Sequence, residues 1–324
     1  MQFPLLVSQV AFGYFCCYIR IMPQKIKTAI DGHEIELTNL EKVLFPDSGT
    51  TKSELIHYYL KIAPIMLPHL KGRPLSFQRF PDGVGAEGFF QKQVPANYPP
   101  WIKRFTLGLH EIVDYASADS AADLVYFAQQ AVVVIHTSLA RADKPHHPDL
   151  IIFDLDPQME SFEPVRTTAF GLREILDGLG LKCFVKVTGG RGLHVTVPLD
   201  PEADFDEVHD FAVRVAKLYE GLHSEDTTTE MSKAKRGERV FIDTNRNHFS
   251  QTAVAPYSVR AGKKPTVAAP ITWEELEDSR LKPNGYAIND IFELLERRPD
   301  PWLRIYDKGQ SLKQAAARLA KLES

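Results

Sequence analysis

Three aspartates and one histidine stand where a sheet could bring their side chains together. Asp154 and Asp156 lie two residues apart at the end of an apolar segment, and Asp243 ends another such segment. Side chains two apart in a strand point to the same face, so the first two carboxylates would lie side by side. Clustered carboxylates repel one another unless a cation neutralises them. Oxygen ligands suit Mg²⁺ or Mn²⁺, and a pair of such ions can hold the attacking and leaving oxygens of a phosphoryl transfer.

The pattern of apolar residues from Asp149 onward predicts the sheet that would unite these side chains. The elements follow the order βαββαβ, with strands at 150–155, 182–187, 192–197 and 239–243 and helices at 162–179 and 205–223. Right-handed crossovers place the first strand of such a unit between the third and the fourth. Asp243 and His194 would therefore flank the aspartate pair on the face opposite the helices. Arg239 and Phe241 would point to that same open face.

The aspartates have a second interpretation. An Asp-x-Asp pair at the end of a strand can cap the following turn without binding a metal ion. Turn capping accounts for Asp154 and Asp156, but it does not account for Asp243 and His194 on neighbouring strands. The combination favours a metal site, with Asp154 and Asp156 contacting both ions and Asp243 the ion nearer the nucleophile.

A glycine-rich segment joins the second and third strands and could hold phosphate groups. It reads Thr188-Gly189-Gly190-Arg191-Gly192. Backbone N–H groups of paired glycines can form an anion-binding nest, and the Thr188 hydroxyl, Arg191 and His194 would add donors. A glycine hairpin without a ligand is the competing interpretation.

Two arginines follow the fourth strand. Arg246 and Arg260 could bind the phosphates of a nucleotide, although a lone arginine is more often part of a surface ion pair. His136, which follows an apolar run, could reach a sugar or a phosphate, or it could be a core histidine. Phe89 and Phe90 lie in a loop rich in glycine and proline. They could stack on bases or fill their own core.

Composition limits the class of protein. The chain has 324 residues, of which 44% are hydrophobic and 25% charged, as in ordinary globular proteins. A net charge of −4 does not indicate nucleic-acid binding, so such a partner would need a local basic face. The cysteines, Cys16, Cys17 and Cys183, match neither a zinc motif nor a disulfide framework, which is typical of a reducing compartment.

The start of the chain differs from the rest. Residues 1–21 are apolar and aromatic, with Arg20 as their only charge. They lack the basic start and small-residue cleavage site of a signal peptide. A segment of ordinary polarity begins at Met22, so we expect residues 1–21 to be a non-native extension outside the fold. We expect no membrane-spanning segment elsewhere.

The remaining elements are expected to be short. In the region 36–140, apolar spacing predicts a helix at 53–66 capped by Ser53 and another at 120–130 capped by Ser120 or Asp119. Towards the C-terminus we expect helices at 273–276, 288–296 and 311–322.

Several sequence blocks resemble the polymerase domain of bacterial DNA ligase D, a member of the archaeo-eukaryotic primase superfamily. The blocks are Leu37–Pro46, Gly72–Leu75, Ile152–Pro157, Lys186–Val195 and Gln251–Ala261. The resemblance runs from about residue 36 to 302. It implies an α+β primase fold, with an RRM-like βαββαβ catalytic sheet at about 149–260, an N-terminal α/β subdomain at about 36–140 and C-terminal helices at about 270–324. Residues 22–324 would form a single domain.

The resemblance also implies an activity. It indicates a template-dependent nucleotidyltransferase that adds NTPs or dNTPs to 3′ ends at DNA breaks and gaps in non-homologous end joining. Two Mn²⁺ or Mg²⁺ ions would assist, with ribonucleotides preferred. The sequence contains no Lys-x-Asp-Gly ligase motif, so we expect a separate ATP-dependent ligase acting in trans, along with a Ku homologue. The expected location is the cytoplasm, at the nucleoid.

Residue roles follow from the matched blocks. Asp154, Asp156 and Asp243 would bind the metal ions. The resemblance assigns the nucleotide phosphates to Thr188, Gly189, Arg191, His194, Arg246 and Arg260, and the sugar to His136. It assigns a downstream 5′-phosphate to Asn39, Lys42 and Lys52, and base stacking to Phe89 and Phe90. Related sequences usually have Ser in place of Thr188 and Lys in place of Arg191, and they often have a basic residue in place of Gln78.

Three other functions compete with an end-joining polymerase. A replicative or plasmid primase would start chains de novo and would not need Lys42 and Lys52 to read a 5′-phosphate. A non-catalytic module that binds DNA ends would gain nothing from three acids facing phosphates. A metal-dependent phosphodiesterase would not need a triphosphate cradle of threonine, histidine and arginine.

Overall fold

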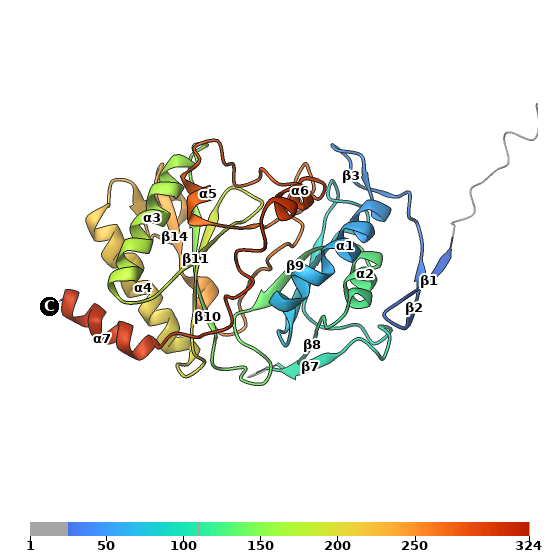
Figure 1. Cartoon of the computed structure of the whole chain (residues 1–324), viewed down its shortest axis with the longest axis horizontal. Helices are drawn as coiled ribbons and strands as arrows, with labels where there is room; N and C mark the ends of the chain where they lie inside the picture. The colour runs from blue at the N-terminus through green and yellow to red at the C-terminus, as the bar shows by residue number, and fades with distance from the viewer. Residues whose placement is uncertain (1–24, 109–110, 324) are drawn as a thin grey trace, which may run out of the picture.

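The computed structural model describes residues 25–108 and 111–323 (Figure 1). The expected non-native extension at 1–21 lies outside the described residues. In the described part of the chain, no helix has the length and apolar character needed to cross a membrane. Cys183 is buried and free.

The predicted βαββαβ unit is present. Its sheet has the order β13-β14-β10-β12-β11-β16, so the first strand, β10, lies between the third, β12, and the fourth, β14, as predicted. Helices α3 and α4 cover one face (Figure 1). The bounds are β10 Leu150–Asp156, α3 Glu163–Gly178, β11 Phe184–Val187, β12 Leu193–Pro198, α4 Phe205–Leu222, β13 Thr227–Thr228, β14 Val240–Asp243 and β16 Pro270–Ile271.

Alternating side chains explain the two faces of this sheet. Ile151, Phe153 and Leu155 of β10 are completely buried beneath the helices. Asp154 and Asp156 point to the other face and are half-buried. Strand β14 begins at Val240, one residue later than predicted, so Arg239 lies outside the strand. The Arg239 guanidinium instead donates to the backbone carbonyls of Lys235 and Arg236.

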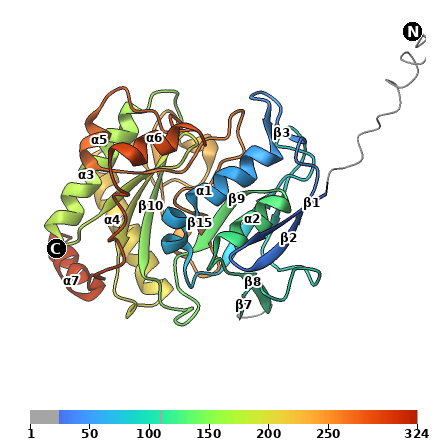
Figure 2. The ribbon, with the colours of Figure 1, turned by 45° about the vertical axis from the view of Figure 1, so that its right-hand side comes forward.

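A second sheet faces the first. It has the order β15-β9-β5-β8-β7, with β6 paired to β5. Helices α1 and α2 pack side by side on it (Figure 2). The bounds are α1 Lys52–Leu70, β5 Leu75–Arg79, β6 Phe89–Gln91, β7 Arg104–Leu107, β8 Val113–Ala116, α2 Ala121–Gln129, β9 Val132–Ser138 and β15 Thr252–Val254. Because β15 follows the βαββαβ unit in the chain, it ties that unit to the N-terminal subdomain.

Helix α1 departs from the prediction at both ends. Its N-cap is Thr51, which forms a reciprocal capping box with Glu54, so the expected Ser53 cap was wrong. The helix continues to Leu70 despite Pro64 and Pro68, because its last two turns are buried against the core. Helix α2 is capped by Ser120, as predicted.

The remaining elements lie around the two sheets. They are β1 Ile26–Ile30, β2 His33–Leu37, β3 Val43–Phe45, β4 Thr50–Thr51, the 3₁₀ turns η1 Lys233–Lys235 and η2 Asn245–Asn247, and the helices α5 Trp273–Glu277, α6 Asp290–Arg297 and α7 Leu312–Leu322. Buried apolar residues from both sheets belong to one continuous core.

Candidate active site

A cavity of 540 Å³ lies between the two sheets. Strands β10 and β12 and the glycine-rich segment contribute one wall, and β5, β6, β9 and β15 contribute the other. Among the predicted site residues, the cavity is lined by Phe90, His136, Asp154, Asp156, Thr188, Arg191, His194, Arg246 and Arg260. Asp243, Gly189 and Phe89 do not line it. Parts of the chain that are far apart in sequence thus meet at one site.

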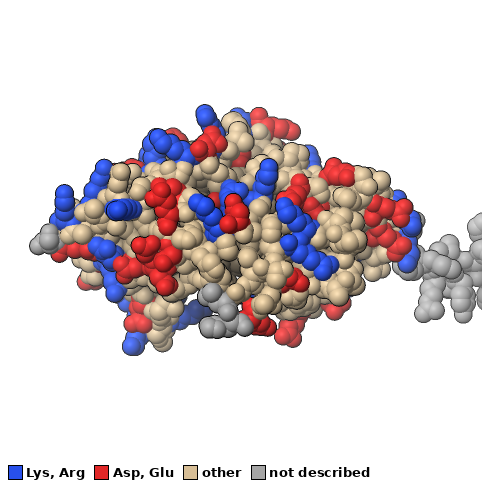
Figure 3. All heavy atoms as spheres, turned by 90° about the horizontal axis from the view of Figure 1, so that it is seen from below, with Lys and Arg blue, Asp and Glu red and all other residues tan. Residues whose placement is uncertain are grey.

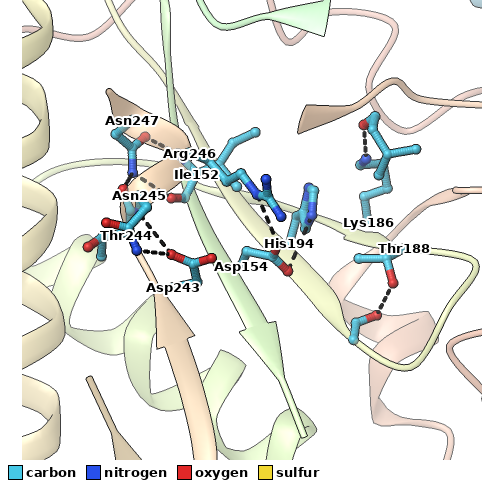
Figure 4. A network of polar contacts seen from close by, with 12 residues as sticks. Ile152, Asp154, Lys186, Thr188, His194, Asp243, Thr244, Asn245, Arg246 and Asn247 are labelled. Carbon is cyan, nitrogen blue, oxygen red and sulfur yellow. Dashed lines mark hydrogen bonds and ion pairs between the residues drawn. The ribbon is translucent and has the colours of Figure 1, made fainter. Parts of the chain in front are cut away.

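The carboxylates lie on neighbouring strands, as predicted. Asp154 of β10 pairs across the sheet with Asp243 of β14 on one side and with His194 of β12 on the other. Residues directly opposite in antiparallel strands have side chains on the same face, about 5 Å apart at Cβ. Strand register therefore explains how residues about 40 and 90 positions apart converge (Figure 4).

The surroundings of the two β10 aspartates push their pKa values in opposite directions. Burial alone would raise the pKa of Asp154, but His194, Arg246 and Lys186 hold it well below its usual range. Burial, together with the charges of Asp154 and Asp243, raises the pKa of Asp156. Asp154 is therefore a stable carboxylate, whereas Asp156 ionises against the repulsion of its neighbours.

The donor set fits a divalent cation. Three carboxylates share one face. Burial and then the charges of Asp154 and Asp243 raise the pKa of Asp156, and such an ion would relieve the repulsion among the three. Among residues 25–108 and 111–323, no three acidic, histidine or cysteine side chains form a ready-made metal cluster. Asp243 instead accepts from the Asn245 backbone at 2.9 Å and side chain at 2.7 Å (Figure 4).

His194 and Arg246 hold Asp154 from two sides. His194 Nε2 lies 3.4 Å from Oδ1, and Arg246 Nε lies 3.5 Å from Oδ2. Burial and the charge of Lys186 lower the pKa of His194 to about 4, so its ring is neutral at pH 7. Its Nδ1 atom is buried and has no protein partner among the described residues. The imidazole thus presents a polar atom without a protein partner at the site.

Two residues that support the site were not singled out from the sequence. Asn247 bonds the backbone of Ile152 through both side-chain atoms, at 2.9 and 2.8 Å, and so fixes the turn after β14 against β10. Lys186 is buried opposite His194 and donates to the Val254 carbonyl at 2.6 Å. Strand alternation could have indicated Lys186, since it occupies a position whose side chain shares the face of His194.

The predicted backbone nest was wrong. The Gly189 N–H donates to the Pro283 carbonyl at 3.0 Å, and the Gly190 N–H donates to the Thr188 hydroxyl at 3.3 Å. That hydroxyl in turn donates to the Gly192 carbonyl at 3.1 Å. Because these groups already have protein partners, the arginine side chains are the main anion donors of this wall.

Gly189 contributes to the site through its lack of a side chain rather than through its N–H. Its φ is +70°, and a Cβ there would come within 2.8 Å of Arg260 Cγ and of the Val267 carbonyl group. The missing side chain therefore lets Arg260 pass beside the loop into the cavity. Burial lowers the pKa of Arg260, while the charges of Asp154 and Asp156 oppose that shift.

The opposite wall carries Phe90, whereas its neighbour Phe89 lies outside the cavity. Phe89 and Phe90 are 48% and 64% exposed, so they do not fill a core of their own. The Phe90 ring lies 5.7 Å from that of His136. Burial and the charges of Arg260 and Arg246 lower the pKa of His136 to about 3, which makes it neutral. Its Nε2 atom has no protein partner within the described chain.

The three residues expected to read a 5′-phosphate also lie together. Asn39 begins a tight turn with φ of +53°, and the Lys42 N–H donates to its carbonyl at 3.0 Å. Lys52 is buried and donates to the Thr38 carbonyl at 2.9 Å. Burial and the charge of Lys42 lower the pKa of Lys52 to about 8. Lys42 pairs with Asp82 at 2.9 Å.

One face of the molecule carries surface charge of both signs. On the side shown in Figure 3, basic and acidic side chains are interspersed. The cationic residues that line the cavity are therefore the more informative group.

A family model matches most of the chain. Residues 51–302 match the model of a family described as LigD, primase-polymerase domain. The chain belongs to this family. The multifunctional non-homologous end joining DNA repair protein LigD of Mycobacterium tuberculosis is 37% identical over 262 residues, 78% of this chain and 34% of that protein. The bifunctional non-homologous end joining protein LigD of Bacillus subtilis is 28% identical over 279 residues, 86% of this chain and 45% of that protein.

A solved structure supports the same conclusion for the fold. The polymerase domain from Mycobacterium tuberculosis ligase D, in complex with DNA, matches with a TM-score of 0.80 at 34% identity. The match covers 85% of this chain and 99% of that one. The fold is therefore the α+β primase-polymerase fold of LigD, as predicted. The chain spans less than half the length of the two LigD relatives.

Proposed function

We propose that this LigD primase-polymerase domain is a nucleotidyltransferase that adds NTPs or dNTPs to the 3′ ends of broken or gapped DNA, directed by a template, in non-homologous end joining. The observation that carries the proposal is the position of Asp154. It lies between Asp243 and His194 in a cavity whose other charged side chains include Arg191, Arg246 and Arg260.

Each wall of the cavity suits one part of a nucleotide. Arg191, Arg246 and Arg260 would bind the triphosphate, because guanidinium groups pair with phosphate oxygens in a bidentate manner. His136, which is neutral, would contact the sugar, and Phe90 would stack on a base. The exposed aromatic ring and the three arginines lie on opposite walls, so the nucleotide would span the cavity.

The three aspartates would hold two Mn²⁺ or Mg²⁺ ions. When bound, these ions supply charge stabilisation for an in-line displacement at phosphorus. The chain itself contributes an ionised Asp154, fixed from two sides, and an Asp243 fixed by Asn245. Asn247 keeps the turn that carries Arg246 against β10.

The proposed macromolecular partner is DNA with a 5′-phosphate downstream of the gap. The positive charges of Lys42 and Lys52 repel each other, and a dianionic end group would relieve that repulsion. A Ku homologue and an ATP-dependent ligase acting in trans belong to the same proposal, as does a cytoplasmic location with the DNA.

Primer extension on three substrates tests this function. We expect addition in Mn²⁺ on a gapped duplex, stronger with a 5′-phosphate than with a 5′-hydroxyl, and with NTPs preferred over dNTPs. Synthesis on an unprimed template, unaffected by a 5′-phosphate, would instead support a primase that starts chains de novo. DNA binding without any addition would support an end-binding module.

A further inference from the structure

Tyr257 has an unusual backbone conformation close to the nucleotide cavity. Its φ is +65°, a region that a bulky residue rarely adopts, and its side chain is completely buried. It lies three residues before Arg260. Strained residues persist only where the surrounding structure holds them, and they concentrate at functional sites. The contacts that hold Tyr257 in this conformation therefore indicate which part of the site depends on it.

Helix α1 holds the backbone of this segment. The Tyr58 hydroxyl donates to the Tyr257 carbonyl at 2.6 Å. The hydroxyl of the next residue, Tyr59, accepts from the Val259 N–H at 3.2 Å. On the other side, the Tyr257 N–H donates to the Ala268 carbonyl at 2.7 Å. Both backbone groups of the strained residue are thus fixed.

A buried hydrogen-bonded pair lies against the Tyr257 side chain. His69 Nε2 is 2.7 Å from Asp300 Oδ2, and the two side chains are only 1% and 5% exposed. The His69 ring lies 5.9 Å from that of Tyr257. Burial and the charge of Asp300 raise the pKa of Tyr257. The pair thus joins α1, the C-terminal segment and Tyr257 in one polar cluster.

The segment leads directly to the cavity. Val259 pairs with Val267, and the Arg260 N–H donates to the Thr266 carbonyl at 2.8 Å. The Arg260 side chain then passes Gly189 to line the cavity. Any change in the backbone at Tyr257 would therefore alter the direction in which Arg260 enters.

We propose that Tyr58, Tyr257 and the His69–Asp300 pair are positioning residues for Arg260, and that they determine the affinity of the domain for a nucleotide triphosphate. The proposal rests on the proposed function of the cavity. It assigns a role in nucleotide binding to residues of α1 and of the C-terminal segment that do not line the cavity.

The simpler alternative is that this cluster only stabilises the fold. Tyr58→Phe and Asp300→Asn distinguish the two, because one removes only the Tyr58 hydroxyl and the other only the Asp300 charge, with little change in volume. Tyr219→Phe is the matched control, since Tyr219 is also buried but belongs to α4 and does not line the cavity. Each variant would also be made in an Arg260→Ala background.

The measurements are the affinity for ATP with Mn²⁺, by titration calorimetry, and the KM and kcat of primer extension. With Arg260 present, we expect Tyr58→Phe or Asp300→Asn to weaken affinity about 5- to 20-fold, since a buried group loses its partner. KM should rise while kcat stays within about threefold. In the Arg260→Ala background the same changes should cost less than about twofold, because the effect passes through Arg260.

Two results would overturn the inference while leaving the function intact. One is unchanged ATP affinity in folded Tyr58→Phe, and the other is an equal loss with and without Arg260. If Asp300→Asn fails to fold, the milder Tyr58→Phe still decides between the alternatives. Absence of ATP binding by the unaltered protein would overturn the proposed function itself, and the inference with it.

Discussion

Replacing Gly189 with alanine should damage both the fold and the nucleotide cavity. The residue has φ of +70°, and the new Cβ would lie 2.8 Å from Arg260 Cγ and from the Val267 backbone. Ordinary contacts of a Cβ are at least 3.4 Å. The Arg260 side chain can move away, but the Val267 main chain cannot do so without disturbing its pairing with Val259.

The loss of folding stability caused by Gly189→Ala can be estimated from two effects, the backbone conformation and the close contact. A left-handed backbone costs a non-glycine residue about 1–2 kcal/mol. The contact with the backbone adds about 1–2 kcal/mol, as overpacking in a dense interior does. A total of about 2–4 kcal/mol corresponds to a fall in Tm of roughly 3–6 °C for a domain of this size. Movement of Arg260 should weaken nucleotide affinity about tenfold or more, since a charge-assisted contact contributes about 1.5–3 kcal/mol.

Thermal unfolding with and without ATP and Mn²⁺ measures both effects. Gly178→Ala is the matched control, because a Cβ there meets nothing within 4 Å and the residue ends helix α3. That control should be neutral or slightly stabilising, since alanine favours a helix over glycine. If Gly189→Ala unfolds at the same temperature as the control and gains as much stability from ATP, the account of this loop is wrong.

Four further changes test other parts of the site. Asp156→Asn should raise thermal stability without metal, because burial and neighbouring charges disfavour its ionised form, and should abolish primer extension. Burial lowers the pKa of Lys186 from 10.5 to about 7 in the folded protein. The folded state therefore binds fewer protons than the unfolded state between pH 7 and pH 10.5, so the stability of the wild type is highest above pH 10.5 and falls as the pH is lowered to about 7. The Tm of Lys186→Met, minus that of the wild type, should therefore decrease from pH 7 to pH 10, and a constant difference would contradict the shift. Lys52→Met should bring the ratio of extension on gaps with and without a 5′-phosphate close to one, where an unchanged ratio would exclude Lys52 from that role. Phe90→Ala should alter unfolding free energy by less than about 0.5 kcal/mol but reduce templated addition about 5- to 100-fold, as loss of base stacking does.

The centre of the site could be predicted because short-range rules determine it. Alternation along β10 places Asp154 and Asp156 on one face, and the handedness of crossovers places Asp243 and His194 beside them. These rules depend only on the order and type of elements. The sequence blocks added the proposed nucleotide roles of Arg246 and Arg260, which alternation alone does not indicate.

The parts that escaped prediction depend on contacts between distant segments. The Gly189 N–H is occupied by Pro283, nearly a hundred residues later, so the nest expected from local sequence does not form. The pairing of β15 with β9 and the His69–Asp300 pair likewise join residues more than a hundred positions apart. Helix α1 is capped by Thr51 rather than Ser53, because both residue types can cap but only Thr51 has a glutamate, Glu54, in the reciprocal position.

The central claim is that the carboxylates between the two sheets carry out nucleotide addition. The most direct measurement is single-turnover extension of a primer on gapped, 5′-phosphorylated DNA in Mn²⁺, comparing the wild type with Asp154→Ala. Retained DNA binding, monitored in parallel, controls for folding. The account predicts templated addition by the wild type and a loss of at least about a thousandfold in the variant. Equal rates for both proteins would contradict it.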